Sequence, residues 1–132
     1  MKKYYFLALL LIAAPLGAQT YTPEQQRQQM EYMTATVPAS LACTCSSYVQ
    51  AQVTNSESLK GTRDYDGLTR ASKWLMGFCA KAISKQQPGQ EAKWSSKMVD
   101  IYQDSLKLNR AELDKKITQC ENKMDSYIPK AK

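Results

Sequence analysis

Four cysteines are the most distinctive residues in this chain of 132 residues. Two of them are separated by a single threonine, whereas the other two lie far along the sequence. On a helix, residues two apart point about 200° away from each other, because each turn contains about 3.6 residues. The neighbouring cysteines are therefore expected to bond to different distant partners, since a ring between them would be strained. The four are Cys43, Cys45, Cys79 and Cys120.

The cysteines are expected to form structural crosslinks, which are typical of small exported domains. Of the three pairings open to four cysteines, we predict Cys45–Cys79 and Cys43–Cys120, because Cys45 and Cys79 each fall on the apolar face of a predicted helix. A strained Cys-x-Cys redox centre competes with this interpretation, although the usual redox signature is Cys-x-x-Cys. A metal site is disfavoured because the chain contains no histidine and exported cysteines are oxidised. We expect neither a metal nor a cofactor.

The absence of histidine also excludes the nucleophilic triads that depend on an imidazole base. Paired carboxylates are the remaining route to catalysis, as in the hydrolysis of glycosides. We interpret the first of two such pairs as a cap for the helix that follows it. The second pair lies one helical turn apart with a lysine on either side, which is typical of a solvated helix face. The pairs are Asp64/Asp66 and Asp100/Asp104, and the lysines are Lys97 and Lys107.

A basic stretch supplies the candidate binding surface. Between residues 60 and 97 there are eight basic residues and three acidic ones. On a helix, Trp74 falls about 40° from the centre of a stripe formed by four of the cations. An aromatic side chain beside cations is typical of a protein-binding hot spot. The competing interpretation is that Trp74 covers the edge of the core and the cations are merely solvated. The predicted partner-binding residues are Trp74, Arg70, Lys73, Lys81 and Lys85.

The first 18 residues have the layout of a secretory signal peptide. Two lysines precede an apolar run from Tyr4 to Ala14, and small residues follow up to Ala18. We predict cleavage near Ala18 and a location in the periplasm or outside the cell. The remaining single domain, residues 19–132, has a net charge of +4, because the signal holds two of the 18 basic residues and none of the 12 acidic ones. An uncleaved membrane anchor is the competing interpretation, but the apolar run is short for a span.

Apolar residues recur at helical spacing along the chain, and no segment has the alternation of a convincing strand. Thr22 with Gln25, and Asn109 with Glu112, have the spacing of capping boxes, and Pro38 interrupts a helix. One kinked helix is the alternative to a break near Asn109. We therefore predict an all-α fold, a small disulfide-crosslinked bundle of four to five helices. The expected ranges are 23–36, 40–54, 66–86, 90–108 and 109–127, with a polar connection over 55–67.

The predicted function is that of an exported, non-enzymatic helical protein that binds a partner protein in the bacterial periplasm. An immunity protein or inhibitor would act by occlusion, presenting Trp74 and its basic neighbours to the acidic cleft of a toxin or cell-wall hydrolase. One alternative is a secreted, basic, envelope-associated protein that adheres to anionic lipid or lipopolysaccharide as a peripheral contact. A carboxylate-dependent hydrolase is the other. Nucleic acid is not expected, because the basic surplus is small and the chain is exported. The oligomeric state is open.

Overall fold

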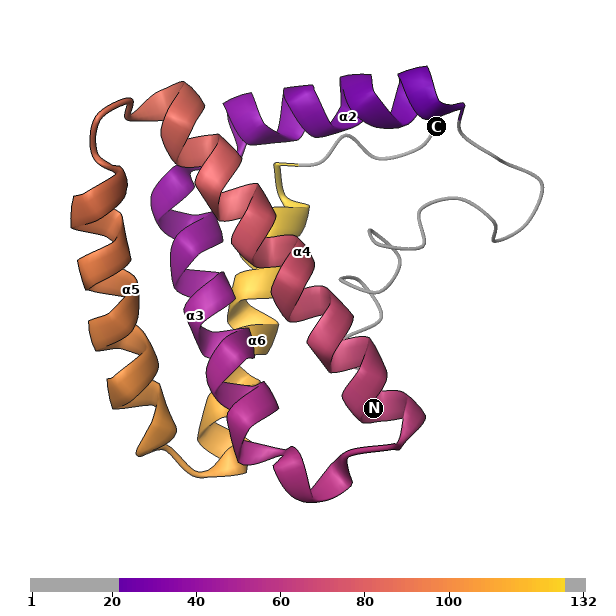
Figure 1. Ribbon diagram of the computed structural model, residues 1–132, viewed down its shortest axis with the longest axis vertical. Helices are drawn as coiled ribbons and strands as arrows, with labels where there is room; N and C mark the ends of the chain where they lie inside the picture. The colour runs from indigo at the N-terminus through magenta and orange to yellow at the C-terminus, as the bar shows by residue number, and fades with distance from the viewer. Residues whose placement is uncertain (1–21, 128–132) are drawn as a thin grey trace.

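Five α-helices and one short 3₁₀ helix make up the part of the chain that this computed structural model describes, residues 22–127 (Figure 1). Within that range there is no strand, and no helix is long and apolar enough to cross a membrane. The predicted all-α, disulfide-crosslinked bundle is confirmed, whereas the predicted signal peptide lies outside the described residues. The elements are α2 (Pro23–Thr36), α3 (Ala39–Asn55), η2 (Glu57–Leu59), α4 (Arg63–Gln86), α5 (Glu91–Leu106) and α6 (Arg110–Asp125).

Two of the helices begin with the capping boxes that the sequence predicts. At the start of α2, the Gln25 backbone N–H donates to Thr22 Oγ1 at 3.1 Å, and the Thr22 N–H donates to Gln25 Oε1 at 2.9 Å. At the start of α6, the Glu112 N–H donates to Asn109 Oδ1 at 2.8 Å, and the Asn109 N–H donates to Glu112 Oε1 at 3.1 Å. These bonds satisfy backbone groups that have no partner inside the helix. The chain therefore starts a new helix after Asn109, and the single kinked helix is excluded.

The connection between α3 and α4 is shorter than the polar stretch predicted over residues 55–67. Helix η2 occupies part of it, and α4 begins three residues earlier than expected. The cap of α4 is Thr62, whose Oγ1 accepts a hydrogen bond from the Tyr65 N–H at 3.2 Å. The expectation that Asp64 and Asp66 cap this helix is wrong. Both lie exposed in its first turn, where the helix dipole favours carboxylates.

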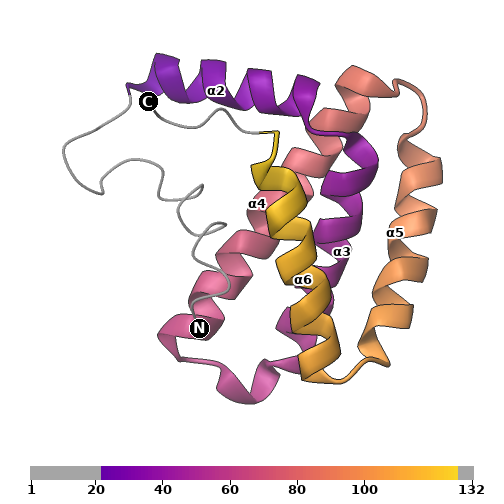
Figure 2. The ribbon, with the colours of Figure 1, turned by 180° about the vertical axis from the view of Figure 1, so that it is seen from behind.

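Helix α3 lies in the middle of the bundle and packs against α4, α5 and α6. Figures 1 and 2 show α5 on one side of it, with α4 and α6 on the other. Such a position requires a helix that is buried on more than one face, and small side chains allow the neighbouring axes to approach closely. The sequence of α3 meets both conditions. Its buried residues are Ala39, Ala42, Cys43, Cys45, Ser46, Ser47, Val49, Ala51 and Gln52.

Two disulfides join α3 to two different helices. Cys43 bonds to Cys79 of α4, with Cα atoms 4.8 Å apart, and Cys45 bonds to Cys120 of α6, with Cα atoms 5.7 Å apart. The prediction that the neighbouring cysteines face different partners is confirmed. The predicted pairing of Cys45 with Cys79 and Cys43 with Cys120 is wrong, and a Cys43–Cys45 redox ring is not formed.

The pairing follows from the neighbours on each side of α3. Cys43 belongs to a small apolar cluster with Cys79, Ile83 and Trp94. Cys45 belongs to the main core, which contains the buried face of α6. Because α3 is buried on several faces, the presence of a cysteine on an apolar face does not tell which helix it meets. The α6 residues in the main core are Leu113, Ile117, Cys120 and Met124.

A buried polar contact ties the C-terminal half of α3 to the start of α6. Gln52 is fully buried, and its Nε2 donates to Asp114 Oδ1 at 2.6 Å. The bond lies inside the bundle, where the loss of either partner removes a hydrogen bond from a buried polar group. The contact fixes the register of the two helices.

The side-chain amide of Gln86, at the end of α4, holds the junction between α2 and α3. Its Nε2 donates to the carbonyl oxygens of Thr34 and Val37 at 2.8 and 2.7 Å, and its Oε1 accepts from the Ala39 N–H at 2.9 Å. Pro38 has no N–H and so leaves the Thr34 carbonyl without its usual helical donor. Gln86 replaces that donor and clamps the turn onto α4.

Helix α2 lies across one end of the bundle, and its N-terminal part extends beyond α4 (Figures 1 and 2). It packs against α4. Only Met33 and Thr34 are buried, and both are near its C-terminal end. The first turns of α2 therefore contribute little to the core, and the Gln86 clamp is the main polar attachment of its other end.

Removal of one disulfide at a time tests the pairing. Peptide mapping is a poor test of the pairing. Only Thr44 separates Cys43 from Cys45, so the two cysteines stay in the same peptide after digestion. The double variants Cys43→Ala/Cys79→Ala and Cys45→Ala/Cys120→Ala are each expected to retain one disulfide and no free thiol. Each is expected to lose about 2–4 kcal/mol of the free energy of unfolding, because a crosslink restricts the unfolded chain.

Thiol titration under denaturing, non-reducing conditions measures this outcome. The crossed variants Cys43→Ala/Cys120→Ala and Cys45→Ala/Cys79→Ala serve as controls. Each is expected to contain two free thiols, since its remaining cysteines lie on different sides of α3. Thiol-free crossed variants would contradict the observed pairing.

Candidate functional site

Helix α4 presents the predicted binding residues because its other face is buried in the bundle. Leu68, Leu75 and Phe78 are among the side chains that it buries, and they recur at helical spacing. The opposite face must then meet water. The structure places all four predicted cations on that exposed side, and it leaves Trp74 half-buried. The exposed cations are Arg70, Lys73, Lys81 and Lys85.

Trp74 forms part of the edge of the core. Its ring stacks on that of Phe78, with centroids 5.1 Å apart and planes 27° from parallel, and it packs against the main core. The side chain is still partly open to solvent. Trp74 therefore covers the edge of the core, as the competing interpretation holds, and its role in binding a partner stays a prediction.

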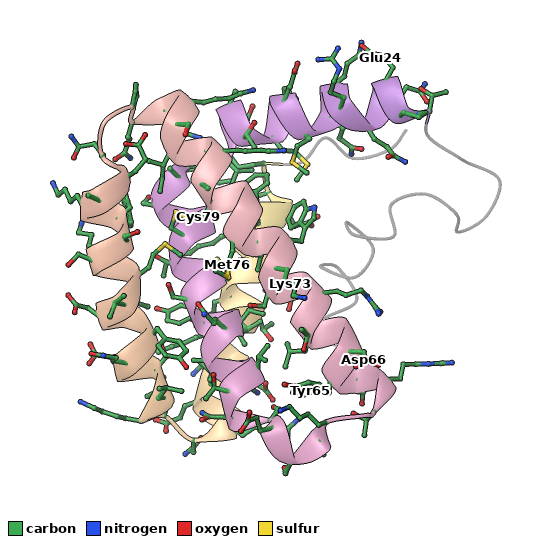
Figure 3. The ribbon with its side chains drawn as sticks, in the orientation of Figure 1. Glu24, Tyr65, Asp66, Lys73, Met76 and Cys79 are labelled. Carbon is green, nitrogen blue, oxygen red and sulfur yellow. A yellow bond between two sulfur atoms is a disulfide. The ribbon has the colours of Figure 1, made fainter. Side chains whose placement is uncertain are left out.

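The predicted surface divides into two directions around α4. With about 100° per residue, Lys81 and Lys85 point within about 20° of Trp74. Arg70 points about 40° away from Trp74, and Lys73 about 100° away. Figure 3 shows Lys73 on the face of α4 turned toward the viewer. The structure thus groups Trp74 with Lys81, Lys85 and Arg70, and separates Lys73 from them.

A groove of about 520 Å³ lies between α2 and α4. Both Lys81 and Lys85 line it, so the groove includes two of the residues that the sequence predicts to bind a partner. Pro23 and Met30 give the α2 wall an apolar surface. The remaining lining residues are Gln26, Arg27, Glu31 and Thr34.

The two walls of this groove differ in charge. On α2, Arg27 forms ion pairs with Glu24 and with Glu31, the latter at 2.6 Å, and the hydrogen bond from Arg27 lowers the pKa of Glu24. On α4, the only hydrogen bond of Lys85 within residues 22–127 is to the backbone carbonyl of Glu31, at 3.3 Å. No acidic side chain in that range forms an ion pair with Lys81 or Lys85. The α4 wall is therefore positive, whereas the three paired charges on α2 sum to −1.

A second groove, of about 380 Å³, lies where α4 and α5 flank α3, and sequence reasoning missed it. Met76 and Val99 are 43% and 52% exposed at this groove, although both are apolar. One residue in the sequence could have indicated this groove. Met76 is apolar but lies next to Leu75, outside the buried apolar stripe of α4, so its side chain had to be exposed. The other lining residues are uncharged: Gln50, Ser95, Met98, Tyr102 and Gln103.

The carboxylate pairs do not form an enclosed site. Asp64, Asp66, Asp100 and Asp104 are all exposed, and none of them lines either groove. Lys107 forms an ion pair with Asp104 at 3.9 Å. Lys97 lies over the Trp94 ring, 4.9 Å from its centroid. Within residues 22–127, no three histidine, cysteine, aspartate or glutamate side chains converge as metal ligands would.

Glu121 is a perturbed carboxyl group that sequence reasoning also missed. Burial raises its pKa to about 7, and its Oε1 is buried without a hydrogen-bond partner in the described part of the chain. Its position gave a signal, because Glu121 lies four residues after Ile117 and three before Met124, both of which are fully buried. A residue with this spacing lies beside the core stripe of its helix.

Comparison with protein-family models, with curated proteins and with solved structures finds no match.

The raised pKa of Glu121 predicts a specific dependence of stability on pH. Between about pH 4.5 and 7 the folded state holds more protons at this group than the unfolded state, so its contribution to stability falls as the pH rises through that window. Replacement by neutral glutamine is expected to leave stability unchanged near pH 4. At pH 8, Glu121→Gln is expected to stabilise the fold by about 1 kcal/mol, a value reduced for solvent screening because the side chain is only half-buried.

Denaturant unfolding of the wild type and Glu121→Gln at pH 4 and pH 8 measures the difference. Glu91→Gln, in which an exposed carboxylate is neutralised, is the matched control. Parallel pH profiles for the wild type and Glu121→Gln would contradict the assignment.

Proposed function

We propose that this chain is an exported, non-enzymatic helical protein that binds a partner protein through the basic side of α4. The observation that carries the proposal is the grouping of exposed Lys81 and Lys85 with half-buried Trp74 on one helix face, beside a groove whose other wall includes Pro23 and Met30. The residues that contribute most of the binding free energy of a protein interface are usually aromatic residues and cations with apolar groups around them.

Two features support export. The first is the signal-like layout of residues 1–18, with cleavage near Ala18 and a location in the periplasm or outside the cell. The second is the use of cysteine, because all four cysteines form disulfides. Structural disulfides persist in oxidising compartments and are rare in the cytosol.

The proposed mechanism is occlusion of an acidic cleft, as expected of an immunity protein or an inhibitor of a toxin or cell-wall hydrolase. The two crosslinks fix α4 and α6 against α3 before binding, so that these helices lose little conformational entropy when the partner docks. Trp74 supplies contact area, and the cations steer the encounter with an acidic surface.

Adhesion of α4 to an anionic membrane has less support. An interfacial helix inserts an apolar face among the lipids. The apolar face of α4 is instead buried against α3 and the core, and Trp74 stacks on Phe78. Besides the cations, the exposed side of α4 offers a lipid only part of Trp74 and Met76, which is much less than the continuous apolar face of an interfacial helix.

Affinity capture from periplasmic extract tests the proposal with the immobilised wild type and Arg70→Glu/Lys81→Glu. These two exposed cations lie about three turns apart on α4, so their reversal changes the surface without removing core contacts. We expect the variant to retain about a tenth or less of the partner, since like charges placed against an acidic cleft repel.

Lys93→Glu/Lys115→Glu makes the same change in charge on α5 and α6 and is expected to capture the partner normally. Trp74→Ala is a less direct variant, because it also removes the stacking on Phe78. Equal capture by the wild type and Arg70→Glu/Lys81→Glu would eliminate this surface as the binding site.

A further inference from the structure

We infer that the groove between α2 and α4 receives one helix of the partner protein, which carries two carboxylates one turn apart beside an apolar stripe. This inference rests on the proposed function and adds the shape and chemistry of the occupant. The groove is called the α2/α4 corner below, and it is defined by Pro23, Met30, Lys81 and Lys85, with Trp74 farther along the same face of α4.

The shape of the corner suits an elongated, convex occupant. Helix α2 lies across the end of α4 and extends beyond it, so the two helices form a re-entrant angle (Figures 1 and 2). The volume of about 520 Å³ lies within the range of binding pockets. A helix is about 10 Å across and can be laid along α4 into this angle. Because the groove lies between two helices, a convex occupant can contact both walls at once, which favours a partner helix over a flat lipid surface.

The charges of the corner specify the occupant further. Lys81 and Lys85 are four residues apart, which places their Cβ atoms about 5–6 Å from each other. Two carboxylates with the same spacing on a partner helix face both lysines at once. Arg27 and its two paired carboxylates, Glu24 and Glu31, leave α2 with a net charge of −1 at this wall. The carboxylates of the occupant are therefore expected to face the lysines of α4 and to point away from α2.

The apolar groups of the corner specify the stripe beside those carboxylates. Met30 is half-buried, and Pro23 is exposed at the start of α2. Trp74 continues the apolar surface along α4. An apolar stripe on the occupant removes these groups from water, while its carboxylates stay at the lysine rim.

The weak attachment of α2 allows the corner to accept side chains of different size. Residues 22–28 are all exposed, whereas Gln86 clamps the other end of the helix. Displacement of the N-terminal turns of α2 therefore breaks few buried contacts. The corner is a site with one fixed wall, on α4, and one adjustable wall.

Selection from a phage-displayed library of helical peptides tests the inference on the intact, disulfide-bonded protein. Peptides selected on the wild type are expected to carry Asp or Glu at positions i and i+4 beside an apolar stripe. Their affinity is expected to fall about tenfold or more with Lys81→Glu/Lys85→Glu, and to fall on raising the salt concentration. Lys93→Glu/Lys97→Glu, an exposed pair with the same spacing on α5, is the matched control and is expected to bind normally.

Chemical-shift mapping of a selected peptide is expected to affect Met30, Trp74, Lys81 and Lys85. Selection without acidic enrichment, equal binding to both double variants, or shifts confined to another face would overturn the inference. So would salt-sensitive binding of the wild type to phosphatidylglycerol vesicles that is lost in Lys81→Glu/Lys85→Glu while no peptide is selected.

The capture experiment separates this inference from the proposed function. If a partner is captured through Arg70 and Lys81 but no helix binds the corner, the inference fails and the proposed function stands. If acidic helices bind the corner but no partner is captured from extract, the site is supported and the proposed periplasmic function fails.

Discussion

The packing of three helices around α3 is the constraint on which the rest of this structure depends. A helix in that position must be buried on several faces, and the small residues of α3 satisfy this requirement. The core of a domain this small contributes little surplus stability. Two disulfides add to it, each typically worth about 2–4 kcal/mol. Because Cys43 and Cys45 lie two residues apart and face different neighbours, one short segment of α3 fixes both α4 and α6.

The same constraint positions the proposed binding surface. The last two turns of α4 contain Cys79, which bonds to α3, and Gln86, which binds the junction between α2 and α3. Lys81 and Lys85 lie between these two attachments. The lysines are therefore carried by a segment of α4 that is attached on both sides, and the wall opposite them belongs to α2, whose first turns are exposed. A rigid cationic wall facing an adjustable one suits recognition of a partner whose side chains vary.

Features encoded by neighbouring residues could be predicted from the sequence. The capping boxes at Thr22 and Asn109 each involve residues three apart, and the break at Pro38 follows from its own ring. The cap of α4 is Thr62 and neither Asp64 nor Asp66, because the helix begins three residues before the predicted start. The disulfide pairing could not be predicted, because it depends on which helix lies on each side of α3. The α2/α4 corner and the contacts of Gln86 join residues far apart in the chain, and no local pattern predicts them.

Native-state hydrogen exchange, followed residue by residue, tests most directly whether α3 is the fixed centre of the molecule. The amides of α3 between Ala42 and Gln52 are predicted to exchange most slowly, only through global unfolding, because the helix is covered by three others and crosslinked to two of them. The amides of the first turns of α2 are predicted to exchange fastest among the helices, through local opening. Exchange of the α3 amides as fast as those of α2 would contradict this account.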